Sequence, residues 1–129
     1  MNHILLIEDE PQLCENITEL LEVSGFAVQW AATARRGADL LLSDPPALVL
    51  CDLSLPDQEG YFVLEQLNGS ELVVPFIFLS ARVDTQDIRR AMNLGADDYI
   101  MKPFSTSDLL AAVKARLAKY ARLRRLLAG

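Results

Sequence analysis

The sequence predicts an α/β fold with a doubly wound parallel sheet, and three observations support this. Short apolar runs typical of buried strands alternate five times with segments of helical hydrophobic periodicity. The segments between strands carry helix-start and helix-stop residues, such as Pro11 and Gly25. The chain has 129 residues, of which 51% are hydrophobic, which suits one domain with one filled core. Because right-handed crossovers place helices on both faces of a parallel sheet, we expect a covered sheet of five βα units.

The first two βα units lie in the first third of the chain. "HILLI" (residues 3–7) is an apolar run, and Pro11 with Asp9 before it is typical of a helix start. Apolar residues then fall on one helical face as far as Gly25, where the helix should end. "FAVQWA" (26–31) alternates as a strand, and Thr33 is expected to cap the next helix.

The remaining three units follow in the same order. Strands are expected over 47–52, 73–81 and 96–103, and helices around 62–67, over 84–95 and over 106–127. Pro75 should lie near the start of its strand, because proline cannot donate a hydrogen bond to a sheet.

The last predicted helix is longer than the core it has to cover. Its apolar stripe continues through Leu123 and Leu127, and six of the 12 basic residues follow Asp108. We therefore divide the chain into a domain over 1–120 and an extension of the last helix over 121–129. This extension is expected to be a linker toward another domain or a dimerisation helix.

Charge and composition exclude several classes of protein. No apolar run approaches the roughly 18 residues of a membrane helix, and the first residues lack the features of a signal peptide. We expect a cytoplasmic protein with no membrane contact, in which Cys14 and Cys51 are small core residues. The arginines at 122, 124 and 125 form a basic cluster, but the net charge is −6 and no recognition motif is present. We expect no direct contact between this domain and nucleic acid.

Reactive side chains follow four of the five predicted strands. Because ligands of open parallel sheets bind beyond the carboxyl ends of the strands, these side chains should meet at one edge. An aspartate at the end of a buried run, such as Asp52, also needs a cation or hydrogen bonds to hold it. The second strand ends in alanines, which carry no chemistry. The reactive residues are Glu8 and Asp9 after the first strand, Asp52 after the third, Ser80 after the fourth and Lys102 after the fifth.

Three clustered carboxylates indicate a cation site. They repel one another and stay ionised near neutral pH only if a cation compensates them. Ligands that are all oxygen suit Mg²⁺, which keeps several waters and is bound together with phosphate oxygens. With Mg²⁺ and Lys102 nearby, one carboxylate could attack phosphorus and become an aspartyl phosphate, while the Ser80 hydroxyl binds a phosphoryl oxygen.

Four motifs carry a family resemblance. In order and spacing they resemble the receiver domain of two-component response regulators, over roughly residues 2–120. The resemblance implies a flavodoxin-like fold with strand order 2-1-3-4-5. It also implies a phosphorylation-controlled switch that catalyses only its own phosphorylation and dephosphorylation. The motifs are "IEDE" (7–10), "DLSLPDQEG" (52–60), "LSA" (79–81) and "DDYIMKPF" (97–104).

The resemblance implies a set of Mg²⁺ ligands. Asp9 would bind the metal directly, and Glu8 would act mainly through metal-bound water. Asp52 and the backbone carbonyl of Ser54 would complete the site.

The resemblance also implies the residues that handle the phosphoryl group. Asp52 would be the phosphoacceptor, with Lys102 and Ser80 in contact with the phosphoryl group. Tyr99 takes the place of the aromatic switch residue, which responds to Ser80 by turning inward. Pro103 would follow a cis peptide bond. The lifetime of the acyl phosphate would be tuned by Ser54 and Arg82, two residues beyond Asp52 and Ser80.

The implied partners are external. His3 is the only histidine and lies in the first strand, so the donor would be a sensor histidine kinase or a histidine phosphotransfer protein. The responsive surface would comprise residues 84–94, 97–101 and 106–120, and a homodimer would form through that surface or through the last helix. Ala112 stands where winged-helix regulators usually carry an arginine for the intersubunit ion pair. The output domain or protein is left open.

Simpler roles compete with these assignments. Glu8 and Asp9 could favour a helix N-terminus through its dipole, and Asp52 could be a turn residue. Ser80 could cap the following helix, and Tyr99 could be an ordinary half-buried strand aromatic. Asp97 and Asp98 are expected to be surface charges and not ligands.

Two other functions also compete. Haloacid dehalogenase-like phosphatases use an aspartate nucleophile after a strand, but they place a second Asp where this chain has Ser54. Short loops also leave little room for a substrate pocket. A degenerate receiver that binds partners without phosphorylation would lack an acid, the lysine or the acceptor, and none of these is missing here.

Overall fold

The computed structural model describes residues 3–128, so residues 1, 2 and 129, at the ends of the predicted domain and extension, lie outside it. Strands and helices alternate throughout, as predicted. The strands are β1 (His3–Ile7), β2 (Ala27–Ala31), β3 (Leu48–Asp52), β4 (Phe76–Ser80) and β5 (Asp98–Met101). The helices are α1 (Pro11–Val23), α2 (Ala34–Ser43), α3 (Tyr61–Asn68), α4 (Thr85–Asn93) and α5 (Thr106–Ala128).

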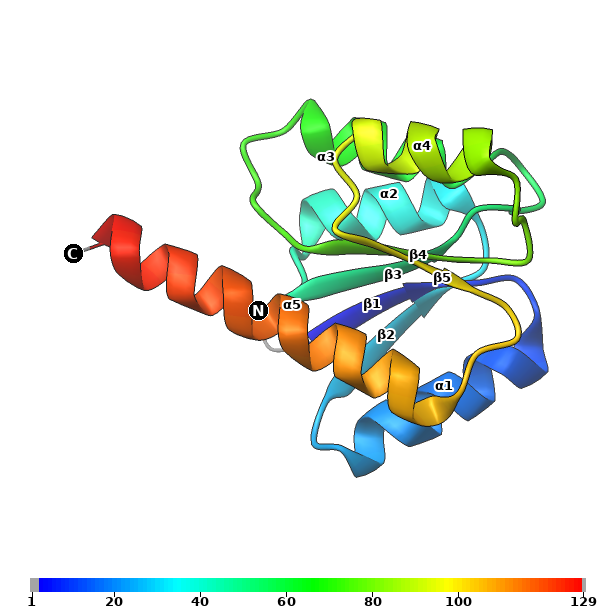
Figure 1. Ribbon diagram of the computed structural model, residues 1–129, viewed down its shortest axis with the longest axis horizontal. Helices are drawn as coiled ribbons and strands as arrows, with labels where there is room; N and C mark the ends of the chain where they lie inside the picture. The colour runs from blue at the N-terminus through cyan, green and yellow to red at the C-terminus, as the bar shows by residue number, and fades with distance from the viewer. Residues whose placement is uncertain (1–2, 129) are drawn as a thin grey trace.

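The strands form one parallel sheet in the order β2-β1-β3-β4-β5, which confirms the expected fold. Helices α2, α3 and α4 cover one face of the sheet, and α1 and α5 cover the other (Figure 1). Successive strand residues point to opposite faces, so each strand supplies both cores. Leu5 and Ile7 of β1 pack toward α2 and α3, whereas Ile4 and Leu6 pack toward α1 and α5.

The register of the sheet brings the carboxyl ends of the strands to one edge. Ile7 at the end of β1 pairs with Cys51, and Asp52 at the end of β3 pairs with Leu79. Ser80 at the end of β4 then pairs with a residue of β5. The loops that follow these strands therefore emerge side by side.

The predicted helix starts at Pro11 and after Thr33 are observed. Thr33 caps α2 as expected, accepting a hydrogen bond from the Arg36 amide at 3.1 Å. Helix α1 begins at Pro11, but its cap is Glu10 and not Asp9. The Glu10 carboxylate accepts hydrogen bonds from the first two helical amides that can donate, which leaves the Asp9 side chain free of the helix.

Asp97 and Asp98 were expected on the surface, but both are half-buried. Asp97 accepts hydrogen bonds from the Phe76 amide at 2.8 Å and from the Tyr120 hydroxyl at 2.8 Å. It therefore ties α5 to the start of β4. Asp98 lies 3.6 Å from an Arg116 nitrogen of α5.

Helix α5 extends beyond the body of the domain toward the C-terminus (Figure 1). Leu109 and Val113 are fully buried in its first half, whereas Leu123 is 41% exposed and Leu127 is 88% exposed. The apolar stripe thus continues past the core that it packs against. None of the helices within residues 3–128 combines the length and the apolar character that a bilayer crossing requires.

Candidate functional site

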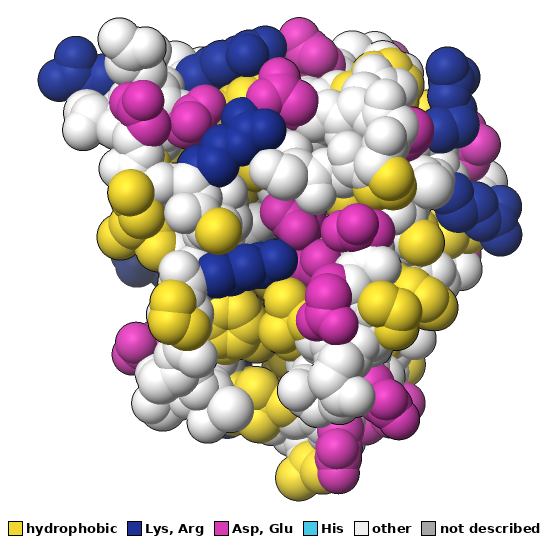
Figure 2. Space-filling view, turned by 90° about the vertical axis from the view of Figure 1, so that its right-hand side faces the viewer, with side chains coloured by type: hydrophobic (Ala, Val, Ile, Leu, Met, Phe, Trp, Pro, Cys, Tyr) yellow, Lys and Arg dark blue, Asp and Glu magenta, His cyan; other side chains and the backbone are white. Residues whose placement is uncertain are grey.

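Three carboxylates meet at the carboxyl edge of the sheet. Glu8, Asp9 and Asp52 each offer an oxygen within 4.8 Å of the others. Glu8 and Asp52 are buried, whereas Asp9 is exposed. Acidic side chains accordingly gather in the middle of this face, with basic side chains beside them and a hydrophobic patch below (Figure 2). The β1–α1 loop and the end of β3, distant in sequence, together form this cluster.

The ammonium of Lys102 enters the same cluster from the loop after β5. Its Nζ donates to Glu8 Oε1 at 2.7 Å and to Asp52 Oδ2 at 3.1 Å. Burial alone would lower the pKa of Lys102, but its bond to Glu8 and the charge of Asp52 outweigh this effect and raise it. Burial raises the pKa of Glu8 to about 7; the hydrogen bond from Lys102 opposes this shift, and the charge of Asp52 adds to it.

The second strand also contributes to the site, contrary to expectation. The indole Nε1 of Trp30 in β2 donates to the backbone carbonyl of Glu8 at 2.7 Å. The Cys14 thiol of α1 donates to the same carbonyl at 3.2 Å. Two side chains therefore hold the backbone from which Glu8 projects, and only the fold reveals this role of Trp30.

The loop after β3 is fastened to the end of its own strand. The Ser54 amide donates to Asp52 Oδ1 at 2.9 Å, and the Gly60 amide donates to the Leu53 carbonyl at 2.8 Å. A Cβ atom at position 60 would lie 2.4 Å from the Asp52 carbonyl oxygen, so only glycine allows this approach. Asp57 fastens the far side of the loop by accepting bonds from the first amides of α2.

The loop after β4 links the remaining candidate residues. Ser80 is fully buried, and its hydroxyl accepts a hydrogen bond from the Arg82 amide at 3.0 Å. Helix α4 is capped by Asp84, so Ser80 is not the cap of that helix. Tyr99 is half-buried, and its hydroxyl donates to the Arg82 carbonyl at 2.9 Å.

Two further observations concern neighbouring positions. The Lys102–Pro103 peptide bond is cis.

The side chain of Arg82 reaches across to the loop after β3, where its Nε donates to the Ser54 hydroxyl at 3.1 Å. The two residues that the family resemblance assigns to rate tuning are thus in direct contact.

The donor set fits Mg²⁺. When all three carboxylates are ionised, Lys102 leaves two negative charges uncompensated, which a divalent cation would balance. All the candidate donors are oxygens, which suit a hard cation, and the exposed Asp9 leaves one side open to water. The resemblance to receiver domains also implies Mg²⁺ at this acidic cluster.

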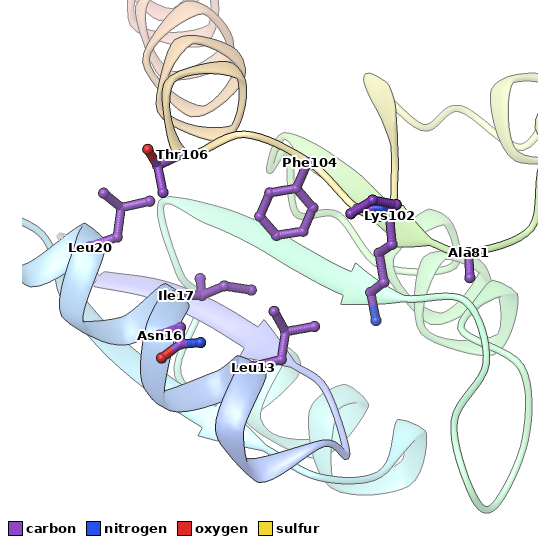
Figure 3. A pocket seen from close by; sticks show the side chains of 9 residues that line it. Leu13, Asn16, Ile17, Leu20, Ala81, Lys102, Phe104 and Thr106 are labelled. Atoms are coloured by element: carbon purple, nitrogen blue, oxygen red, sulfur yellow. The ribbon is translucent and has the colours of Figure 1, made fainter.

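A hollow of about 510 Å³ opens beside Lys102, between α1 and the loop after β5. Leu13, Ile17 and Phe104 point into it, and Asn16 and Thr106 lie on its lining (Figure 3). The hollow places apolar side chains directly beside the charged cluster.

Comparison with known proteins identifies similar sequences and folds. Residues 4–114 match the family model of the response regulator receiver domain. The chain is 40% identical over 119 residues to Transcriptional regulatory protein KdpE of Mycobacterium tuberculosis (strain CDC 1551 / Oshkosh), covering 92% of this chain and 52% of that protein. It thus spans about half the length of the curated relatives it matches.

Solved structures resemble the whole fold. The CheY-like response regulator receiver domain protein of Methanospirillum hungatei JF-1 has a TM-score of 0.90 and 30% identity, over 95% of this chain and 98% of that one. The non-phosphorylated HemR receiver domain of Leptospira biflexa has a TM-score of 0.84 and 34% identity, over 91% of this chain and 94% of that one.

We predict that Asp9→Ala weakens Mg²⁺ binding at least about tenfold, a loss seen even for residues that only support a ligand. Trp30 is the only tryptophan of the sequence and bonds to the Glu8 carbonyl, so its fluorescence should report the titration. Calorimetry provides a second readout. Glu15→Ala, which removes an exposed acid of α1 outside the cluster, should bind Mg²⁺ normally. Wild-type affinity in Asp9→Ala would place the metal elsewhere.

Proposed function

Because the chain belongs to the response regulator receiver domain family, we propose that Asp52 accepts a phosphoryl group from a histidine kinase or a histidine phosphotransfer protein. Receiver domains are regulatory domains of two-component systems, phosphorylated by histidine kinases, and are not classical enzymes. The observation that carries the proposal is the position of the buried Asp52 carboxylate, 3.1 Å from Lys102 Nζ and within 4.8 Å of two further carboxylates.

In the proposed transfer, an Asp52 carboxylate oxygen bonds to phosphorus as the P–N bond to the donor imidazole breaks. The released nitrogen takes a proton from the solvent. The bonds to Asp52 from Lys102 Nζ and the Ser54 amide hold the carboxylate in one orientation for attack. Lys102 then neutralises phosphoryl oxygens, and the Ser80 hydroxyl donates to one of them.

We propose that Glu8, Asp9, Asp52 and the Ser54 carbonyl hold Mg²⁺. When bound, the ion would supply charge neutralisation for the transferring phosphoryl group. Glu8 and Lys102 would complete the charge balance around the acceptor, since their side chains are in contact at 2.7 Å.

Dephosphorylation would occur at the same site. The oxygen of a water molecule bonds to phosphorus, the bond to Asp52 breaks, and its electron pair returns to the carboxylate as inorganic phosphate leaves. Ser54 and Arg82 would tune this rate, because their contact lies on the rim of the site above Asp52.

The donor is expected to dock on the hollow beside Lys102. A protein donor must contact the surface around Asp52, and this hollow offers apolar side chains next to the site. Leu13 is half-buried there, so it can make contact with a partner without leaving the core.

Phosphorylation would become a signal through a chain of hydrogen bonds. A phosphoryl group that draws in the Ser80 hydroxyl also moves the Arg82 amide bonded to it, and with it the Arg82 carbonyl that holds Tyr99. Tyr99 lies on β5, so the surface of α4, β5 and α5 would change. A partner or second copy that prefers the changed surface then shifts the population.

Residues 121–128, the described part of the predicted extension, would serve as a linker or a dimerisation helix. Leu123, Leu126 and Leu127 are exposed there. The curated relatives are transcriptional regulators, and the matched residues make up only about half of their length. The rest of the chain, residues 1–120, would be the receiver itself.

We predict that the wild-type chain gains one phosphoryl group when incubated with Mg²⁺ and a small acyl phosphate, and that Asp52→Asn gains none. The amide cannot form the acyl phosphate. Intact mass measures the modification, and Asp39→Asn, at an exposed position of α2, should label normally. Labelling of Asp52→Asn at the wild-type rate would identify another acceptor. If the small acyl phosphate does not label the wild-type chain, the experiment is repeated with a histidine kinase as the phosphoryl donor.

Leu13→Ala should slow transfer from a phosphorylated histidine phosphotransfer protein roughly fivefold, because truncating a central contact costs about 1 kcal/mol. The same variant should react normally with the small acyl phosphate, which shows that its fold and site are intact. Val73→Ala, which changes an exposed apolar residue before β4, is the matched control. Equal slowing with both donors would argue against docking at this hollow.

Beryllofluoride, a phosphoryl mimic, is expected to shift the NMR signals of Tyr99, α4 and α5 in the wild-type chain. In Tyr99→Phe the shifts beyond the loops should shrink, because the bond from its hydroxyl to the Arg82 carbonyl is lost. Shifts confined to the loops of the wild-type protein would contradict the switch. Light scattering on the same samples tests whether activation produces a dimer.

A further inference from the structure

We propose that Glu59 is a positioning residue that competes with the phosphoryl group for the guanidinium of Arg82, and thereby sets the lifetime of phosphorylated Asp52. This inference rests on the proposed function. Glu59 precedes Gly60 at the end of the loop after β3, and neither its charge nor its spacing in the sequence indicates this role.

The guanidinium of Arg82 is held at the rim of the site by two carboxylates. Its Nη1 donates to Glu59 Oε2 at 2.6 Å and lies 3.5 Å from Asp87 Oδ1 of α4. Its Nε donates to the Ser54 hydroxyl, and the Ser54 amide in turn bonds to Asp52 Oδ1. One residue thus separates the guanidinium from the acceptor carboxylate.

Glu59 cannot follow Arg82 inward, because its backbone is fixed. Ser54 and Glu59 form an antiparallel bridge, and the next residue, Gly60, bonds to Leu53. Close approach of the Gly60 Cα to the Asp52 carbonyl leaves this end of the loop no freedom to move inward. When a phosphoryl group is present on Asp52, it and Glu59 therefore compete for the Arg82 guanidinium.

The exchange leaves neither carboxylate without a hydrogen-bonding or charged partner. Arg90 Nη1 lies 3.9 Å from the other oxygen of Glu59, and its guanidinium stacks 4.0 Å from the centre of the Tyr61 ring, which holds it in place. Asp87 also accepts a hydrogen bond from the Tyr61 hydroxyl at 3.2 Å. Both acids keep a partner when Arg82 leaves.

The phosphoryl group is the stronger competitor. The Arg82 and Glu59 side chains are 31% and 47% exposed, so solvent screens the attraction between them. A phosphoryl group carries about −1.5 to −2 charges and can accept two parallel bonds from a guanidinium. Glu59 therefore lowers the fraction of time that Arg82 spends on the phosphoryl group without preventing the contact.

Coverage by Arg82 would protect the acyl phosphate. Hydrolysis requires the oxygen of a water molecule to bond to phosphorus while the Asp52–P bond breaks, with one water proton passing to the solvent. A guanidinium bound to the phosphoryl oxygens occupies the rim through which water enters. When Glu59 binds Arg82 instead, water can reach the phosphoryl group, and the lifetime of the acyl phosphate on Asp52 becomes shorter.

The test compares acyl phosphate half-lives of the full chain in Mg²⁺. Glu59→Gln keeps the shape of the side chain but removes its charge, and should lengthen the half-life several-fold. The same substitution should have no effect when Arg82 is replaced by Ala. Arg82→Met, which keeps the aliphatic stem, serves if Arg82→Ala does not fold. Glu59→Asp should restore a half-life close to that of the wild type, and Glu65→Gln on the exposed face of α3 should match the wild type.

The outcomes separate this inference from the proposed function. If the wild-type chain takes no phosphoryl group, the proposed function fails and the inference falls with it. If Asp52 is labelled but Glu59→Gln leaves the half-life unchanged, shortens it, or changes it equally without Arg82, only the inference is wrong. The NMR signal of the Arg82 Nε–H gives an independent readout. Beryllofluoride should shift it further in Glu59→Gln than in the wild type, and an equal shift would also overturn the competition.

Discussion

The contact of the Lys102 ammonium with two buried carboxylates is the interaction on which the rest of the site depends. Glu8 and Asp52 end up within reach of each other because parallel strands deliver their carboxyl ends to one edge. Their mutual repulsion would oppose that arrangement, and Lys102 relieves it at 2.7 and 3.1 Å. One ammonium cannot neutralise three carboxylates, so the remaining negative charge favours a divalent cation beside the exposed Asp9.

The scaffold holds this charge cluster from both sides of the sheet. The core under α2 and α3 contains Cys51 of β3, next to Asp52, and Tyr61 at the start of α3. The core under α1 and α5 holds the helix that follows Glu8 and Asp9. Trp30 and Cys14 then fasten the Glu8 carbonyl directly. The charge cluster therefore rests on strands and helices that are packed in both cores.

Arg82, in the loop after β4, makes two separate sets of connections. Its backbone joins the Ser80 hydroxyl to the Tyr99 hydroxyl, and its side chain joins Ser54 to Glu59 and Asp87. A change at Asp52 that moves Arg82 would therefore affect β5, through the Arg82 carbonyl, and α4, through its guanidinium. This double connection offers a physical route from the site to the surface that partners would read, without rearrangement of the sheet.

Much of the fold and the membership of the charge cluster could be predicted from the sequence. Hydrophobic periodicity is a local property, so alternating apolar runs locate the strands and helices. Glu8, Asp52, Ser80 and Lys102 are found from the same runs, because a residue that follows a parallel strand must lie at the shared edge. The exact ends of the elements were less well predicted. The strand expected over 73–81 begins only at Phe76, because Pro75 cannot donate a hydrogen bond to the sheet.

The tertiary structure alone decided the contacts that depend on side-chain direction between distant segments. Three such hydrogen bonds join residues that lie 22 or 23 positions apart, and no local pattern marks them. They link Trp30 to Glu8, Tyr120 to Asp97 and Arg82 to Glu59. The same holds for the α1 cap, where Glu10 and not Asp9 turns toward the helix amides. Sequence determines which groups arrive at the edge of the sheet, because strand ends are set by local periodicity. Which groups then touch depends on the packing of loops and rotamers, and only the folded chain specifies that.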